Sequence, residues 1–253
     1  MLAYPSTISL STRSLTCLAD LIRHHRARIR SRWRRLDPGR QALLALAWLR
    51  NGDTYQRLAA GFGVGVGTVY RYLREAVDLL AAQAPTLAQA IERAALLVWV
   101  ILDGTLVPIE RVADQRPYYS GKHKRHGVNV QILAGPRGHL LWASPALPGS
   151  THDLTAARTH ALIDALAHAN VIVWADKGYQ GARGTVSTPF KGRNLPEPMR
   201  EVNRAHARVR AKGERAVAIL KTWKVLSRLR CDPARATTIT RAIVALQHVE
   251  DPY

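Results

Sequence analysis

The stretch LLVWVILDGT, residues 96–105, decides the fold, because a nearly continuous apolar run ends there on a carboxylate, Asp103. Such a run, closed by a glycine, predicts a buried strand over residues 95–103. A second run, VIVWADKGYQG at 171–181, delivers Asp176 in the same way. Two buried strands that each end on an aspartate indicate a functional site.

The segments between these two strands predict the other layers of an α/β domain. An alternating stretch at 126–135, a Gly-Pro-Arg-Gly turn and an apolar stretch at 139–147 predict a hairpin. A helix is expected over 151–169, with Thr151 as a plausible N-cap, and the second aspartate-bearing strand follows it at 171–176. The expected sheet is therefore mixed and flanked by helices.

The helical connection matters for the two aspartates. Strands joined through a helix can lie parallel to each other. If these two strands are neighbours, Asp103 and Asp176 emerge at the same edge, where open α/β sheets usually bind their ligands.

A third acid, Glu214, lies on a long helix expected over 197–226. At ~100° per residue the helix has one apolar stripe and a second stripe at its flank. The first holds Val202, Val209, Ala216, Leu220 and Trp223, and the second holds Arg210, Glu214, Val217 and Lys221. Glu214 could therefore face the strand ends. It could equally be a surface residue paired with Arg210 one turn earlier.

If the three acids meet, their chemistry is that of a metal site. Carboxylate oxygens suit Mg²⁺ or Mn²⁺. Two such ions ~3.5–4 Å apart can activate a water or a 3′-hydroxyl and stabilise the leaving oxygen of a phosphodiester. Lys177, Arg210 and Lys221 would then position the phosphate backbone.

The charge balance points to a polyanionic partner. The 253 residues hold 37 Lys+Arg against 18 Asp+Glu, a net charge of +19. This favours nucleic acid ahead of an anionic membrane, although a genome rich in Arg codons would give a similar composition. Residues 1–50 alone hold ten basic and two acidic residues, which favours phosphate contact over a merely solvated face.

Residues 1–93 are expected to form a helical domain and residues 94–253 an α/β domain. Within the first, one helix stops at Asn51-Gly52, a second starts at Tyr55, and a glycine-rich break precedes a third. The expected N-cap of the third is Thr68, and its apolar positions are Val69, Tyr72, Leu73, Ala76, Val77 and Leu80. This is a helix-turn-helix pattern, with a plain helical bundle as the alternative. The residues expected to contact DNA from it are Thr68, Arg71 and Arg74.

Other sequence features indicate the cellular location of the protein and further candidate contacts. Cys17 and Cys231 offer neither a zinc spacing nor a disulfide framework, which fits a reducing compartment. No run reaches the ~18 apolar residues of a membrane span, and no signal-peptide core is visible. The expected location is cytoplasmic. In GKHKRHG at 121–127, Lys122 and Lys124 are candidate phosphate contacts, whereas His123, His126 and His152 are more simply solvated or hydrogen-bonded.

Five motifs in order carry a resemblance to a known family. They are ILDGT, YYSGKHKRHGVNVQ, LPGSTHDLTAAR, WADKGYQG and RVRAKGERAVAILKTWKVL. Together they resemble bacterial insertion-sequence transposases of the DDE superfamily, in the group similar to eukaryotic Harbinger-type nucleases. The resemblance covers about residues 37 to 230 and includes the helix-turn-helix.

The resemblance implies an RNase H-like catalytic domain, two bound Mg²⁺ ions, nicking at transposon-end inverted repeats and joining of 3′ ends to target DNA. It also implies a nucleoid-associated protein that acts on double-stranded DNA as a homodimer or larger assembly. Asp103, Asp176 and Glu214 would be the first, second and third catalytic acids.

The sequence departs from the family pattern at one position. The family's C-terminal signature is Tyr, Arg, Glu and Lys; Arg210, Glu214 and Lys221 match it, but Ala207 stands where the Tyr is expected. This bears on how DNA is positioned and on whether the copy is active. Asp153, in STHDL, belongs to another family motif. It precedes a helix, where it could instead satisfy backbone N–H groups, so it ranks behind Asp176 as a ligand.

Two other functions compete with this interpretation. LDGTL also matches part of the haloacid dehalogenase phosphatase loop, but the position of the nucleophilic aspartate is Ile101, so no aspartyl-phosphate could form. A DNA-binding regulator derived from a transposase that lost cleavage is the second, favoured by Ala207 and opposed by the presence of all three acids.

Overall fold

The structure is a computed structural model that describes residues 8–31, 33–110 and 116–251. Of the ranges named above, residues 1–7, Arg32, residues 111–115 and residues 252–253 lie outside the described residues. The chain divides into two compact units. A helical unit comprises Met1–Ala84, Lys221–Ser227 and Thr238–Tyr253, and a sheet unit comprises Pro85–Leu220 and Arg228–Thr237.

These units differ from the ranges expected from the sequence. The expected boundary at residues 93 and 94 falls inside α5 (Leu87–Ala95), which packs with the sheet unit. The last helix, α10 (Ala236–Glu250), lies mostly in the helical unit, and the sequence reasoning had not anticipated it. Glu250 at its end accepts hydrogen bonds from Ser11 and Ser14, which join the two ends of the chain within one unit. The division of the chain into domains of residues 1–93 and 94–253 stays a prediction.

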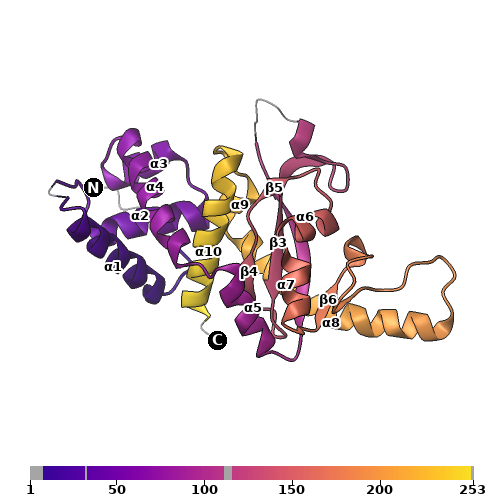
Figure 1. Cartoon of the computed structure of the whole chain (residues 1–253). Helices are drawn as coiled ribbons and strands as arrows, with labels where there is room; N and C mark the ends of the chain where they lie inside the picture. Colours follow the sequence, from indigo (N-terminus) through magenta and orange to yellow (C-terminus); the bar gives the residue numbers. More distant parts are fainter. Residues whose placement is uncertain (1–7, 32, 111–115, 252–253) are drawn as a thin grey trace. The chain divides into compact units, whose positions relative to one another are not determined.

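The helical unit contains the expected helix-turn-helix. Its helices are α1 (Thr12–Arg28), α2 (Pro38–Asn51), α3 (Tyr55–Phe62), α4 (Val66–Gln83), α9 (Lys224–Ser227) and most of α10 (Figure 1). Asp37 caps α2, accepting a bond from the Arg40 backbone N–H at 3.0 Å, and Gly52 ends it in the left-handed conformation. Gly63 ends α3 in the same conformation, with φ +64°. Local capping and two left-handed glycines thus set the turns.

Helix α4 has the two faces that the sequence predicted. The expected apolar positions are all buried: Val69, Tyr72, Leu73, Ala76, Val77 and Leu80. Arg71 and Arg74 are exposed on the opposite side. The expected N-cap was wrong: α4 begins earlier, with Gly65 as its cap, so Thr68 lies inside the first turn.

The sheet unit is built on a mixed sheet. Its strands are β1 (Val100–Pro108), β2 (Tyr119–Ser120), β3 (Arg125–Ala134), β4 (Leu140–Ala143), β5 (Leu147–Pro148), β6 (Val173–Ala175) and β7 (Val186–Ser187). The order is β2-β3-β1-β6-β7, with β4 and β5 also pairing with β3. The hairpin strands are antiparallel, whereas β1, β6 and β7 run parallel.

Helices cover both faces of this sheet. On one face, α5, α6 (Asp153–Thr159) and α7 (Leu162–His168) bury their apolar residues against β1, β4 and β6 (Figure 1). On the other, α8 (Glu197–Thr222) approaches so closely that a Cβ on Gly213 would lie 2.5 Å from the Ile101 side chain. The unit is therefore the RNase H-like arrangement of a mixed sheet flanked by helices.

Several element boundaries differ from expectation. β1 starts at Val100 and runs past Asp103, because β3 continues to pair with it as far as Pro108. The expected helix 151–169 is two helices, since Ala161 adopts the left-handed conformation between them. Helix α8 ends at Thr222, and Val202 of its predicted apolar stripe is 52% exposed.

Candidate functional site

Strand register brings Asp103 and Asp176 together. β1 and β6 pair in parallel, with Leu102 opposite Ala175, and the next residue of each strand is the aspartate. β6 ends at that point while β1 continues against β3. Asp103 therefore lies where its parallel neighbour stops, which confirms the predicted meeting of the two strands but places Asp103 within its strand rather than at its end.

Asp103 is a partly buried carboxylate with a perturbed pKa. Its side chain is 16% exposed, its Oδ1 accepts the Gly104 backbone N–H at 3.0 Å, and its Oδ2 lies 3.9 Å from Nη2 of Arg210. Burial raises the pKa of Asp103 to about 6, and the negative charges of Asp176 and Asp153 act in the same direction. The Arg210 guanidinium and the Gly104 N–H offset part of this rise.

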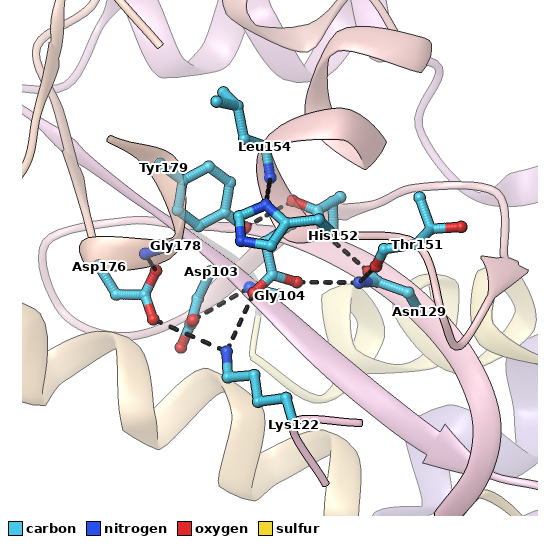
Figure 2. Close-up of polar contacts among 12 residues, drawn as sticks. Asp103, Gly104, Lys122, Asn129, Thr151, His152, Leu154, Asp176, Gly178 and Tyr179 are labelled. Atoms are coloured by element: carbon cyan, nitrogen blue, oxygen red, sulfur yellow. Dashed lines mark hydrogen bonds and ion pairs between the residues drawn. The ribbon is translucent and has the colours of Figure 1, made fainter. Parts of the chain in front are cut away.

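Asp176 is held by the turn that follows β6. Its Oδ1 accepts the Gly178 backbone N–H at 2.7 Å, which closes the short 3-10 helix Lys177–Tyr179 (Figure 2). The side chain is 22% exposed, so one carboxylate oxygen can still accept a ligand from outside. The neighbouring Lys177 is exposed.

A third carboxylate joins them, and it is Asp153. This residue begins α6 and is 8% exposed. Its Oδ1 accepts from Asn129 Nδ2 at 2.8 Å and its Oδ2 accepts from Lys122 Nζ at 3.0 Å. The same Lys122 ammonium lies 3.9 Å from Oδ2 of Asp176 (Figure 2).

Two glycines leave the room that Asp153 needs. A Cβ on Gly104 would overlap the Asp153 carboxylate, and a Cβ on Gly178 would lie 2.8 Å from Asp176 Oδ1 and 3.2 Å from Asp153 Oδ2. Each glycine follows one of the strand aspartates by one or two residues. The glycines of the DG and DKG motifs thus make space for a carboxylate from another part of the chain.

A series of hydrogen bonds between buried polar side chains holds Asp153 in place. Tyr179, fully buried, donates its hydroxyl to Gln131 Oε1; Gln131 donates to Asn129 Oδ1 at 2.7 Å, and Asn129 donates to Asp153. Burial first, and then the charge of Asp153, raise the pKa of Tyr179 well above its usual value. The phenol therefore stays protonated and remains a donor.

Glu214 is not joined to this cluster by contacts. It is exposed on α8, one helical turn beyond Arg210, and among the described residues no hydrogen bond or ion pair links it to Asp103 or Asp176. Within the described part of the chain, no three His, Cys, Asp or Glu side chains are arranged so that they could hold a metal ion as they stand. The arrangement brings together Asp103 and Asp176 of the predicted trio, with Asp153 added.

The cluster nonetheless has the chemistry of a divalent cation site. All three carboxylates offer hard oxygen ligands, and the charge of Asp176 helps to raise the pKa of Asp103. The Lys122 ammonium already spans two of them as a cation. The donor chemistry of these residues therefore suits a divalent ion, although among the described residues the side chains are not arranged to hold one as they stand.

The remaining predicted contact residues lie on exposed surfaces, with one exception. Arg71, Arg74, Lys124 and Lys221 are exposed, and Thr68 lines an open hollow at the start of α4 together with Arg35 and Gly65. Arg210 is 22% exposed and faces Asp103, so it belongs to the acidic cluster.

Two of the histidines named in the sequence make local contacts. His152 is the N-cap of α6, where its Nδ1 accepts from the Leu154 backbone N–H at 3.4 Å (Figure 2). The His126 ring packs edge-on against Tyr119 with centroids 5.2 Å apart.

Sequence reasoning missed Asn129, Gln131 and Tyr179. The first two occupy alternate positions of an otherwise apolar strand, VNVQIL, so both point to one face. Two amides on the buried face of a central strand signal a polar partner there. That signal does not identify the partner.

No helix in the described ranges is long and apolar enough to cross a membrane.

Comparison with known proteins finds matching families and relatives. Residues 102–248 match the family described as DDE superfamily endonuclease, and residues 34–86 match the helix-turn-helix of DDE superfamily endonuclease. The chain is 32% identical over 191 residues to a protein named as a transposase for insertion sequence element IS112 of Streptomyces albus G, covering 74% of this chain and 70% of the relative. It is 25% identical over 199 residues to one named as a transposase for insertion sequence element IS702 of Microchaete diplosiphon, covering 74% and 71%. No solved structure matches the chain.

Proposed function

The chain belongs to the DDE superfamily of insertion-sequence transposases, and from this premise we propose that it cleaves DNA at the inverted repeats ending its own element and joins the 3′ ends to target DNA. The observation that carries the proposal is the parallel register of β1 and β6, which puts Asp103 and Asp176 side by side. Paired, partly buried carboxylates beside an arginine, in a protein of net charge +19, suit an acidic centre that works on a polyanion.

Asp103, Asp176 and Glu214 would hold two Mg²⁺ or Mn²⁺ ions. Bound there, such ions would activate the attacking water or 3′-hydroxyl and stabilise the leaving oxygen of the phosphodiester. Glu214 lies one turn beyond Arg210, which already contacts Asp103. A modest shift or rotation of α8 would turn Glu214 toward the strand ends.

Two residues of the centre have roles that follow from their charges. Asp103 must lose its proton to bind a cation, and Arg210 favours that loss by lowering a pKa that burial raises. Arg210 would also bind a phosphate oxygen of the DNA, for which its forked guanidinium is suited.

The helix-turn-helix would recognise the element ends. Its second helix, α4, presents Arg71 and Arg74 away from the core, as a helix that enters the major groove must. Thr68 would contact the backbone near the start of this helix. Lys122, Lys124, Lys177 and Lys221 would contribute phosphate contacts. Holding two ends together would require at least a homodimer.

A catalytically inactive regulator is the second candidate, favoured by Ala207, which lies exposed on α8 where the family signature has a Tyr. Such a protein would bind the end repeats without cutting them.

The direct test uses DNA that carries the gene with its flanking repeats. The proposal expects nicks at the repeat ends with Mg²⁺ or Mn²⁺ and none with EDTA. Binding without cleavage under every metal condition would support the regulator instead.

A further inference from the structure

We propose that Asp153 is a metal-facing carboxylate of this centre and that Lys122 is an internal cation which a divalent ion must displace from it. The inference rests on the proposed metal-dependent function. It assigns a role to two residues outside the trio of Asp103, Asp176 and Glu214.

Asp153 does not act as a cap for its helix. The N-cap of α6 is His152, and the two oxygens of Asp153 accept from side chains, Asn129 and Lys122. A buried carboxylate at the first position of a helix is usually explained by the backbone N–H groups there. Here the side chain is turned toward the other two aspartates instead.

Two glycines and a hydrogen-bond network fix the position of the Asp153 side chain. Gly104 and Gly178 leave the space that it fills, and the chain from Tyr179 through Gln131 to Asn129 orients its Oδ1. Such a network restricts the rotamers of the carboxylate before any ligand arrives, which is what a metal ligand needs. Its other oxygen, Oδ2, accepts the Lys122 hydrogen bond.

Lys122 supplies the charge that the cluster lacks. Burial opposes its charged form, but the hydrogen bond to Asp153 and the charges of Asp153, Asp176 and Asp103 together raise its pKa. The side chain is 59% exposed and extends from the turn between β2 and β3, so it can swing away without disturbing the core. A divalent ion bound to Asp153 and Asp176 would meet the ammonium at the same oxygens, and like charges cannot share them.

Competition between the Lys122 ammonium and a divalent ion can be measured without DNA or cleavage. Mn²⁺ binding to the full-length protein is followed by electron paramagnetic resonance of the free ion. Lys122→Met should bind Mn²⁺ about fivefold more tightly than the natural protein, the size expected for removal of a partly exposed ion pair. Lys191→Met, at an exposed lysine elsewhere in the sheet unit, should bind Mn²⁺ as the natural protein does.

Asp153 is tested in the same assay. Asp153→Asn should weaken Mn²⁺ binding, and Lys122→Met should add little in that background, because the oxygen for which the two cations compete is gone. Lys122→Gln, which keeps a polar side chain, serves as a second variant, and thermal unfolding in EDTA checks that each protein is folded. Lys122→Met could still tighten Mn²⁺ binding by the same factor in the Asp153→Asn background. That result would overturn the role of Asp153.

Asp103→Asn separates this inference from the proposed function. Loss of Mn²⁺ binding in Asp103→Asn, combined with no gain in either Lys122 variant, would overturn the competition and leave the metal-dependent function intact. Unchanged Mn²⁺ binding in Asp103→Asn would overturn both.

Discussion

The carboxylate of Asp153 fills the space in which a side chain on Gly104 would lie. The glycine that follows Asp103 is therefore required by a residue from a different element, α6, and not by the turn chemistry of its own strand. Because Gly104 has no side chain, the Asp153 carboxylate can lie against β1 at the edge of the sheet where β6 ends.

Gly104→Ala should disturb the acidic centre directly. The added methyl group must displace the Asp153 carboxylate, which is held by Asn129, so we expect a loss of about 1–3 kcal/mol in the free energy of unfolding. Denaturant unfolding in EDTA measures this. Gly121→Ala is the matched control, because nothing lies within 4 Å of a Cβ at that position. Equal stability of the two variants would show that Asp153 is not held where the structure has it.

Asp103→Asn should stabilise the metal-free protein at neutral pH. The folded-state pKa of Asp103, about 6, exceeds the value of about 3.9 in an unfolded chain. The folded state thus binds this proton more tightly, and its stability falls as pH rises from about 4 to 6. Above pH 6 the variant lacks this penalty and should gain about 1–3 kcal/mol.

The measurement is unfolding in EDTA at several pH values. The gain of Asp103→Asn over the natural protein should be present at pH 7.5 and should shrink toward pH 4.5. A variant less stable than the natural protein at pH 7.5, or a gain independent of pH, would mean that burial does not disfavour the charged form of Asp103.

Much of the fold could be predicted from local pattern. The apolar face of α4 and the two aspartate-bearing strands have clear periodicities, and the helical connection between those strands favours the parallel pairing that places Asp103 beside Asp176. Helix ends were less predictable: Gly65 rather than Thr68 caps α4, because both residues have cap chemistry and only the backbone conformation decides.

The role of Asp153 could not be predicted from local sequence pattern. An aspartate at a helix start has an adequate local explanation, and only the tertiary approach of Gly104, Gly178 and Asn129 shows that its oxygens are used elsewhere. The helical period placed Glu214 on the stripe of Arg210, but period alone does not fix how far that stripe is turned toward the sheet. The structure has Arg210 against Asp103 and Glu214 exposed.

Arg71→Ala combined with Arg74→Ala should weaken DNA binding and its dependence on salt. Each phosphate contact contributes about 1 to the slope of log affinity against log salt, so the double variant should lose about 2 if both arginines contact phosphates. Fluorescence anisotropy with end-repeat DNA over a range of salt concentrations measures the slope. Arg137→Ala, an equally exposed arginine on the turn between β3 and β4, should leave the slope within about 1 of its natural value. An unchanged slope in the double variant would remove α4 from the DNA interface.

Glu214→Gln should keep DNA binding and lose cleavage. The substitution removes one negative oxygen from the third acid, and the loss of a metal ligand should lower the cleavage rate by about 100-fold or more. Glu201→Gln, an exposed acid on the same helix, is the control and should cleave normally. Cleavage by Glu214→Gln at the rate of its control would exclude Glu214 from the centre.

The central claim is that Asp103 and Asp176 hold the metal that cleaves DNA. Single-turnover cleavage of DNA carrying the element's own end repeats, measured with Mg²⁺ for the natural protein, Asp103→Asn and Asp176→Asn, tests it most directly. Both variants should bind the repeats as tightly as the natural protein and cut them at least about 100-fold more slowly. Cleavage at the natural rate by either variant would contradict the account.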